Sequence, residues 1–359
     1  MSGHSKTAKC AAVGGALLLP LLLQLFGTHW VRTVDTCLLY VMLALGMNIV
    51  VGYAGLLDLG YVAFYAVGAY LFALLTSPHL TDHFVWIATM FPAGLHTPWW
   101  LTIPLAAVLA AFFGTLLGAP TLKLRGDYLA IVTLGFGEIV RLFINNLGHP
   151  INITDGAKGL GHIDSIRFFG LDLGKPLSLG GHDIASVTLY YYPFLVLAVL
   201  TVIVCHRLQD SRIGRAWMAI RDDEVAAAAM GINTLNMKLL AFAIGASFGG
   251  VAGAMFAAFQ GFISPEAFNL QESVLIVAMV VFGGMGHIRG VILGAVLLTA
   301  VPEALRYVVK PLQAMTDGRL DAGILRQLLI ALAMIITMVL RPHGLWPSPE
   351  HGKSLQPVR

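Results

Sequence analysis

The chain has few charged residues: aspartate, glutamate, lysine and arginine make up only 11% of its 359 residues, whereas 57% are hydrophobic. Soluble domains usually carry about 25% charged residues, so the composition excludes an ordinary soluble fold. The 22 basic and 19 acidic residues leave a net charge of +3. This small, dispersed charge does not indicate a nucleic-acid partner. The composition instead predicts a polytopic helical membrane protein.

Cysteine is also scarce, and the chain lacks the common motifs of catalysis. Cys10, Cys37 and Cys205 lie far apart in or beside apolar runs, which predicts reduced, packed thiols. The twelve histidines form no metal-binding motif such as HExxH, and no Walker motif for nucleotide phosphates is present. The sequence therefore predicts no catalytic site, no metal site and no cofactor bound by this chain, so we do not expect an enzyme.

What the chain has instead is a series of apolar runs, several near the 20 or so residues that a membrane-crossing helix needs. They predict ten helices, near 11–27, 34–52, 61–76, 99–119, 128–147, 188–206, 236–259, 272–283, 291–308 and 324–340. Ten crossings put both termini on the same side of the membrane. The loops on that side contain more lysine and arginine than those on the other, which predicts that it is the cytoplasmic side. Residues 148–187 then form a periplasmic loop, and residues 207–235 a cytoplasmic one.

Two segments with glycine or proline interrupt the apolar pattern, at residues 52–60 and 260–273. Each follows the first helix of one half of the protein, an arrangement typical of transporters with internal repeats. Two unrelated loops are the alternative. Glycines spaced four apart, such as Gly245, Gly249 and Gly253, predict close helix packing in lipid. We expect an all-α polytopic membrane protein with about ten transmembrane helices in two pseudo-symmetric inverted halves.

Residues 207–235 form a charged island between two long apolar runs, with four arginines and three consecutive acidic residues. Ser211 can cap a helix, whose apolar stripe is Ile213, Trp217 and Ile220. Asp222 can cap a second helix, rich in alanine, and Gly231 can end it in the left-handed conformation. The pattern predicts a compact knob that docks on a soluble partner, whereas a solvated loop that obeys the positive-inside rule is the alternative. The residues expected to couple the knob to that partner are Arg212, Arg215, Trp217, Arg221, Asp222, Asp223, Glu224 and Gly231.

This loop, with its stretch GRAWMAIRDDEVAAAAMGIN, resembles the coupling loop of branched-chain amino acid permeases of the LivM type, which belong to ABC importers. Further stretches resemble the same family: LGMNIVVGYAGLLDLGYVAFYAVGAYLFALL at 45–75, LKLRGDYLAIVTLGFGEIVRLFINN at 122–146, GFISPEAF at 261–268, VVFGGMGHIRGVILGA at 280–295 and RPHGLWP at 341–347. The chain departs from the general importer pattern at Val225, where a glutamate is usual, and Glu224 is displaced by one residue.

The resemblance spans residues 34–347 and implies a permease domain there. The terminal segments have no counterpart in it, and we expect an N-terminal tail and first transmembrane helix at 1–33 and a cytoplasmic tail at 348–359. It implies a permease subunit of an ABC importer in the bacterial inner membrane, which moves branched-chain or other hydrophobic or small amino acids inward by alternating access. Its partners would be a second, LivH-like permease, two ATPase subunits that hold ATP and Mg, a periplasmic amino-acid-binding protein and membrane lipid. An ion-coupled secondary transporter, with Glu138 or Asp58 as proton site, is the alternative.

Polar residues inside the apolar spans are candidates for the translocation pathway, because a charge at a helix centre costs about 2.5–3.5 kcal/mol on insertion scales. Glu138 and Arg141 lie one turn apart on one helix face. They either neutralise each other and fix the helix in the bundle, or attract the two charged groups of a zwitterion. The remaining candidates, for which interhelical hydrogen bonding is an open alternative, are Asn48, Asp58, Asn145, Gln260 and Glu272.

Overall fold

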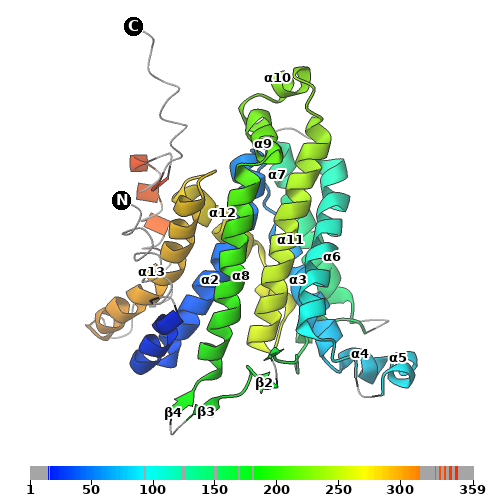
Figure 1. The fold of residues 1–359 in the computed structure, drawn as a ribbon, viewed down its shortest axis with the longest axis vertical. Helices are drawn as coiled ribbons and strands as arrows, with labels where there is room; N and C mark the ends of the chain where they lie inside the picture. Colours follow the sequence, from blue (N-terminus) through cyan, green and yellow to red (C-terminus); the bar gives the residue numbers. More distant parts are fainter. Residues whose placement is uncertain are drawn as a thin grey trace, which may run out of the picture.

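The computed structural model describes residues 15, 17–92, 94–122, 127–148, 152–168, 170–179, 182–315, 328, 331–332, 335–336, 339–341 and 344–346. The described chain is a bundle of long helices that run between two ends (Figure 1). One end carries the short helices α9 (Arg212–Asp222) and α10 (Glu224–Ala229), and we call it the knob end. The opposite end carries the long loop between α7 and α8, and we call it the loop end.

The long helices of the bundle are α2 (Thr28–Asn48), α3 (Val62–Thr76), α6 (Trp99–Thr121), α7 (Asp127–Asn146), α8 (Ser186–Gln209), α11 (Thr234–Gln260), α12 (Leu270–Gly283) and α13 (Ile288–Met315). Seven segments of the described chain are long and apolar enough to cross a membrane. Two predicted spans are shorter apolar helices, Leu17–Phe26 and α3, and the predicted span 324–340 lies largely outside the described residues. A multi-pass helical fold is thus confirmed, whereas the count of ten is not.

Helix α11 lies at the centre of the bundle and packs against α2, α3 and α6. Small residues permit this packing, because lipid supplies no hydrophobic driving force between helices and backbones must approach closely. A Cβ on Gly68 of α3 would come within 2.1 Å of the backbone oxygen of Gly250, and one on Gly253 within 2.0 Å of that of Tyr65. The predicted packing role of the spaced glycines is confirmed at Gly253.

The two interruptions of the apolar pattern are real breaks in the helices. Helix α2 continues into a π-helical turn, η1 (Ile49–Tyr53), and residues 54–61 then run without helix to α3. Between α11 and α12 only a single 3₁₀ turn forms, η3 (Pro265–Ala267). The first break begins beside α9 at the knob end, whereas the second lies toward the loop end, where Ile263 pairs with Leu160 of the long loop.

The loop end is built from short elements. Helices α4 (His79–His83) and α5 (Val85–Met90) precede α6, and the long loop contains η2 (Gly156–Lys158) and two hairpins. The hairpins pair β1 (Arg167–Phe168) with β2 (Leu171–Asp172), and β3 (Leu177–Leu179) with β4 (His182–Ile184).

Asp172 stabilises the first hairpin. Burial tends to raise the pKa of its carboxyl, but hydrogen bonds from the Ser165 hydroxyl and the Gly174 N–H, with the charges of Arg167 and Lys175, outweigh burial and hold the pKa below its ordinary value.

Candidate functional site

The knob, residues 211–231, owes its shape to two capped helices. Ser211 accepts a hydrogen bond of 3.1 Å from the N–H of Gly214 and begins α9, as predicted. The cap of α10 is Asp223, which accepts from two backbone N–H groups at 2.8 and 3.0 Å. The prediction of Asp222 as this cap was wrong by one residue, because α9 extends through Asp222 and only Asp223 has extended backbone. Gly231 has a φ of +85° and ends the second helix as predicted.

Buried contacts fix the knob to the start of α11. Trp217 is fully buried, and its Nε1 donates a hydrogen bond of 2.7 Å to the carbonyl oxygen of Met237. Ile220 is buried beside it, and Ile213 packs against the same core. The predicted apolar stripe is therefore confirmed.

An ion pair adds a second attachment of the knob to α11. Nζ of Lys238 lies 2.6 Å from Oε1 of Glu224. The lysine side chain is 10% exposed and the glutamate side chain 43% exposed, so the cation is the buried member of the pair. The knob is therefore attached to α11 at two points, Trp217 and Glu224.

The outer surface of the knob combines charge with apolar side chains. Arg212, Arg215 and Asp222 are exposed. Val225 is 73% exposed and Met230 84% exposed, at the tip that projects beyond the long helices (Figure 1). Large apolar side chains that are this exposed at the tip of a polar loop are candidates for contact with a partner protein. Sequence reasoning missed these two side chains, although apolar residues in an otherwise polar loop were a usable signal.

Arg221 differs from the other arginines of α9. It is half-buried, and its Nη1 donates a hydrogen bond of 2.6 Å to the carbonyl oxygen of Gly52 in the first break. Asn48, a predicted pathway residue, lies at the same point, where its Oδ1 accepts from the N–H of Gly286 at 2.9 Å. Asn48 thus joins α2 to the turn between α12 and α13.

A small cavity lies where the two breaks approach each other, and we call it the break cavity. Its volume is about 100 Å³. The lining residues come from both breaks and from α3, α7 and α12: Leu59, Val62, Leu134, Gly137, Glu138, Phe268 and Leu270. Glu138 supplies the only charged side chain among them, so the cavity is an apolar space with one carboxylate at its edge.

Glu138 and Arg141 form the ion pair that their spacing predicted. Nε of Arg141 lies 3.0 Å from Oε1 and 3.1 Å from Oε2 of Glu138, and Nη2 also contacts Oε1. The side chains are nevertheless 41% and 29% exposed within a membrane-spanning helix. The pair therefore lies on an outer face of this chain and not inside its own bundle.

The other predicted pathway residues do not gather around this pair. Glu272 accepts a hydrogen bond of 2.7 Å from the Tyr40 hydroxyl, between α12 and α2. Gln260, at the loop end, accepts one of 2.5 Å from Arg32. Asn145 is half-buried in the last turn of α7.

Asp58 is fully enclosed and forms the turn before α3. Its Oδ1 accepts the N–H of Gly60 at 2.8 Å, while the Thr133 hydroxyl of α7 accepts the neighbouring N–H of Leu59 at 3.0 Å. The side chain is 1% exposed. Asp58 therefore stabilises the backbone of the first break through this hydrogen bond and does not line the break cavity.

Asp35 was not singled out from the sequence, although it lies within a predicted span. Its side chain is fully buried in α2, and neither carboxylate oxygen has a hydrogen-bond partner among the described residues. The rule that drew attention to Glu138, a charge inside an apolar run, applies equally to Asp35. Across the described ranges, no three His, Cys, Asp or Glu side chains gather in a way that could hold a metal ion.

Comparison with known proteins identifies the family. Residues 31–338 match the family described as branched-chain amino acid transport system / permease component. The chain is 42% identical over 322 residues to the high-affinity branched-chain amino acid transport system permease protein LivM of Escherichia coli (strain K12), an alignment that covers 86% of this chain and 68% of that protein.

Two more distant relatives extend the comparison. The probable permease protein LivM of Methanocaldococcus jannaschii is 26% identical over 248 residues, 68% of each chain. The permease protein LivH of Escherichia coli (strain K12) is 25% identical over 282 residues, 74% of this chain and 81% of that protein. No solved structure matches. The chain therefore belongs to the family of permease components of branched-chain amino acid transport systems.

Proposed function

We propose that this chain is a permease subunit of an ABC importer that moves branched-chain amino acids, or other hydrophobic or small amino acids, into the cytoplasm. Membership of the permease family supports the transport class. The observation that carries the mechanism is the knob, which is capped, fixed to α11 by Trp217 and presents exposed arginines with Val225 and Met230 beyond the bundle. A loop that only obeyed the positive-inside rule would need neither helix caps nor a buried attachment to α11.

The topology that follows has the knob end in the cytoplasm and the loop end in the periplasm of a bacterium, with the chain in the inner membrane and both termini cytoplasmic. The lysines and arginines of the loops support this orientation. The breaks support two inverted halves, since one begins at the knob end and the other lies toward the loop end. Inverted repeats with broken helices are typical of transporters.

The partners in this proposal are a LivH-like permease, two ATPase subunits and a periplasmic amino-acid-binding protein. Similarity of one chain to both LivM and LivH supports a pair of related permeases. The exposed Glu138–Arg141 pair supports a second subunit on this face of α7, because two charged groups that faced lipid would each be costly. We infer that the translocation pathway runs between the two permeases along this face.

The break cavity fits the proposed substrates. Its aliphatic and aromatic lining can accept a branched side chain, and the carboxylate of Glu138 at its edge can attract an ammonium group. Arg141 beside it can attract the substrate carboxylate.

In this mechanism the ATPases bind ATP and Mg, close on each other and move the two knobs. The helices then rock, and the pathway opens to the other side. Moving a two-state equilibrium from 1:99 to 99:1 takes about 5.5 kcal/mol of differential binding. The rigid attachment of the knob by Trp217 and by the Glu224–Lys238 pair is suited to transmit such a load.

Uptake in proteoliposomes tests the function. The chain is reconstituted with its second permease, the ATPases and the binding protein, and entry of radiolabelled leucine is followed. We expect uptake that requires ATP and persists with an ionophore. Uptake that proceeds without the ATPases and collapses with the ionophore would favour the ion-coupled secondary transporter instead.

A further inference from the structure

Arg221, in the last turn of α9, turns away from the outer surface of the knob and into the bundle. Its side chain is 22% exposed, and Nη1 donates a hydrogen bond of 2.6 Å to the carbonyl oxygen of Gly52. Gly52 belongs to the π-helical end of α2, where the end of a helix leaves carbonyl groups without backbone partners. Arg221 therefore joins the knob directly to the first break.

The turn between α12 and α13 meets the same carbonyl group. A Cβ on Gly286 would come within 2.9 Å of Nη1 of Arg221 and 3.2 Å of the oxygen of Gly52. The N–H of Gly286 donates to Oδ1 of Asn48 at 2.9 Å. No further side chain fits between these groups. Asn48, Gly52, Arg221 and Gly286 thus form one tight contact, which we call the Arg221 junction.

The α12–α13 side of the junction is held by the chain near its end. The N–H of Leu345 donates to the carbonyl oxygen of Phe282 at 2.9 Å, and that of Trp346 to Gly283 at 3.2 Å. The ring of Trp346 stacks on His287, with ring centroids 6.3 Å apart. The turn is therefore a firm attachment point for the junction.

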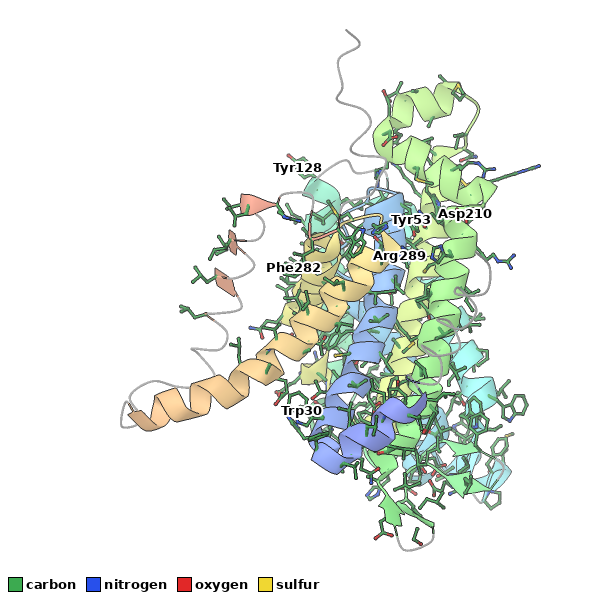
Figure 2. All side chains as sticks on the ribbon, turned by 60° about the vertical axis from the view of Figure 1, so that its left-hand side comes forward. Trp30, Tyr53, Tyr128, Asp210, Phe282 and Arg289 are labelled. Atoms are coloured by element: carbon green, nitrogen blue, oxygen red, sulfur yellow. The ribbon has the colours of Figure 1, made fainter. Side chains whose placement is uncertain are left out.

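The junction connects the knob to the first break and to the turn that follows α12. Figure 2 shows Tyr53 of the first break together with Phe282 and Arg289 of the α12–α13 region near the knob end, while Trp30 at the start of α2 lies at the other end. Helix α2 leads into the first break, and α12 follows the second. A displacement of α9 can thus reach α2 through Gly52 and α12 through the turn at Gly286.

We propose that Arg221 is a positioning residue that transmits movement of the knob to α2 and α12, and that it does not contact the ATPase. The inference rests on the proposed function, in which an ATPase moves the knob. Arg212 and Arg215 of the same helix are exposed, so α9 has an outer face for the partner and an inner face for the junction.

An arginine suits this position. Its guanidinium is always charged and presents donors in a rigid fork, while its aliphatic stem covers the first break. A Cβ on Gly55 would come within 2.6 Å of Cγ of Arg221. A shorter or uncharged side chain would lose either the stem contact or the strong donor to Gly52.

The test uses the complete transporter in proteoliposomes and measures three quantities: ATPase subunits retained by the permeases, ATP hydrolysed, and leucine taken up per ATP. Arg221→Gln should retain the ATPases and continue hydrolysis, whereas leucine per ATP falls roughly tenfold, within the usual range for coupling between sites. Arg221→Lys keeps a charged donor and should recover part of the ratio. Arg207→Gln, an exposed arginine of α8 outside the knob, is the matched control and should leave the ratio unchanged.

Asn48 tests the junction from its other side. Asn48→Leu removes the acceptor for Gly286 and should lower leucine per ATP in the same way. Asn48→Asp keeps an acceptor oxygen for the N–H of Gly286 and should preserve the ratio. Comparison of Asn48→Leu with Asn48→Asp therefore tests the junction even if Arg221→Gln does not accumulate in the membrane.

Two results would overturn the proposal, and a third would overturn the proposed function instead. Normal leucine per ATP in both Arg221→Gln and Asn48→Leu would overturn the junction and leave the importer function intact. Loss of the ATPases from Arg221→Gln would also overturn it, because Arg221 would then be a docking residue. Failure of the unsubstituted complex to take up leucine with ATP would instead overturn the proposed function.

Discussion

The ion pair between Glu224 and Lys238 should respond very differently to removal of each partner. Lys238 is the buried member, with a side chain 10% exposed, whereas that of Glu224 is 43% exposed. Glu224→Gln leaves a buried ammonium without its counter-charge, and breaking a fully buried pair costs about 3–5 kcal/mol. Because water reaches the half-exposed Glu224 side of the pair, the expected loss of stability in Glu224→Gln is about 1–3 kcal/mol.

Lys238→Met removes the buried charge and leaves a carboxylate that water can solvate. Its cost should therefore be below about 1 kcal/mol, as for exposed ion pairs. The double variant Glu224→Gln with Lys238→Met should resemble Lys238→Met alone, since neither charge remains.

Hydrogen exchange of the α10 amides measures this asymmetry in the purified complex. A loss of 1–3 kcal/mol corresponds to exchange that is roughly 5- to 150-fold faster in Glu224→Gln. The Lys238→Met variant should stay within about fivefold of the unsubstituted protein. Equal acceleration in the two single variants, or no recovery in the double variant, would refute the view that Glu224 mainly neutralises a buried lysine.

Three further predictions concern other parts of the chain. Gly68→Ala puts a Cβ within 2.1 Å of a backbone oxygen of α11 and should destabilise the bundle by about 1–3 kcal/mol. Gly135→Ala, whose Cβ would meet nothing within 4 Å, should be nearly neutral. Thermal unfolding in detergent compares the two variants. Glu138→Gln should raise the leucine concentration needed for half-maximal uptake while the ATPases remain bound, and an unchanged uptake curve would assign the pair to packing alone. Burial, with the charges of Arg289 and His206, lowers the pKa of His287 below 6.5 in the folded protein. The stability contributed by its neutral ring is therefore complete above pH 6.5 and is lost as the pH falls below 6.5. The melting temperature of the unsubstituted protein should decline more steeply below pH 6.5 than that of His287→Gln, and parallel curves for the two proteins would contradict this assignment.

Much of the knob was predictable because its determinants are local. Ser211 and Gly231 act on their own turns, and the spacing of Trp217 and Ile220 defines a helix face whatever lies behind it. The cap of α10 was misassigned because two adjacent aspartates can both cap a helix, and the choice depends on where α9 ends.

The role of Arg221 was not predictable from spacing. Its partner is the carbonyl oxygen of a residue 169 positions away, in the π-helical turn that ends α2. The same applies to Asn48 and Gly286, which no local pattern connects.

The break cavity was also not predictable from local sequence patterns, because it forms only when distant helices pack together. Both breaks were visible in the sequence, but their approach to Glu138 follows from how α3, α7 and α12 pack. The count of ten crossings is not confirmed, because two of the predicted spans are short apolar helices and hydropathy alone does not separate these from membrane-spanning ones.

Site-specific cross-linking from the tip of the knob tests the central claim most directly. A photoreactive residue at position 230, the most exposed of the large apolar side chains of the knob, is introduced into the complex in membranes that are importing leucine. The account predicts a cross-link to a nucleotide-hydrolysing subunit whose yield changes when ATP is trapped. Active import with no such cross-link, from position 230 or from positions 212 and 225 in turn, would contradict it.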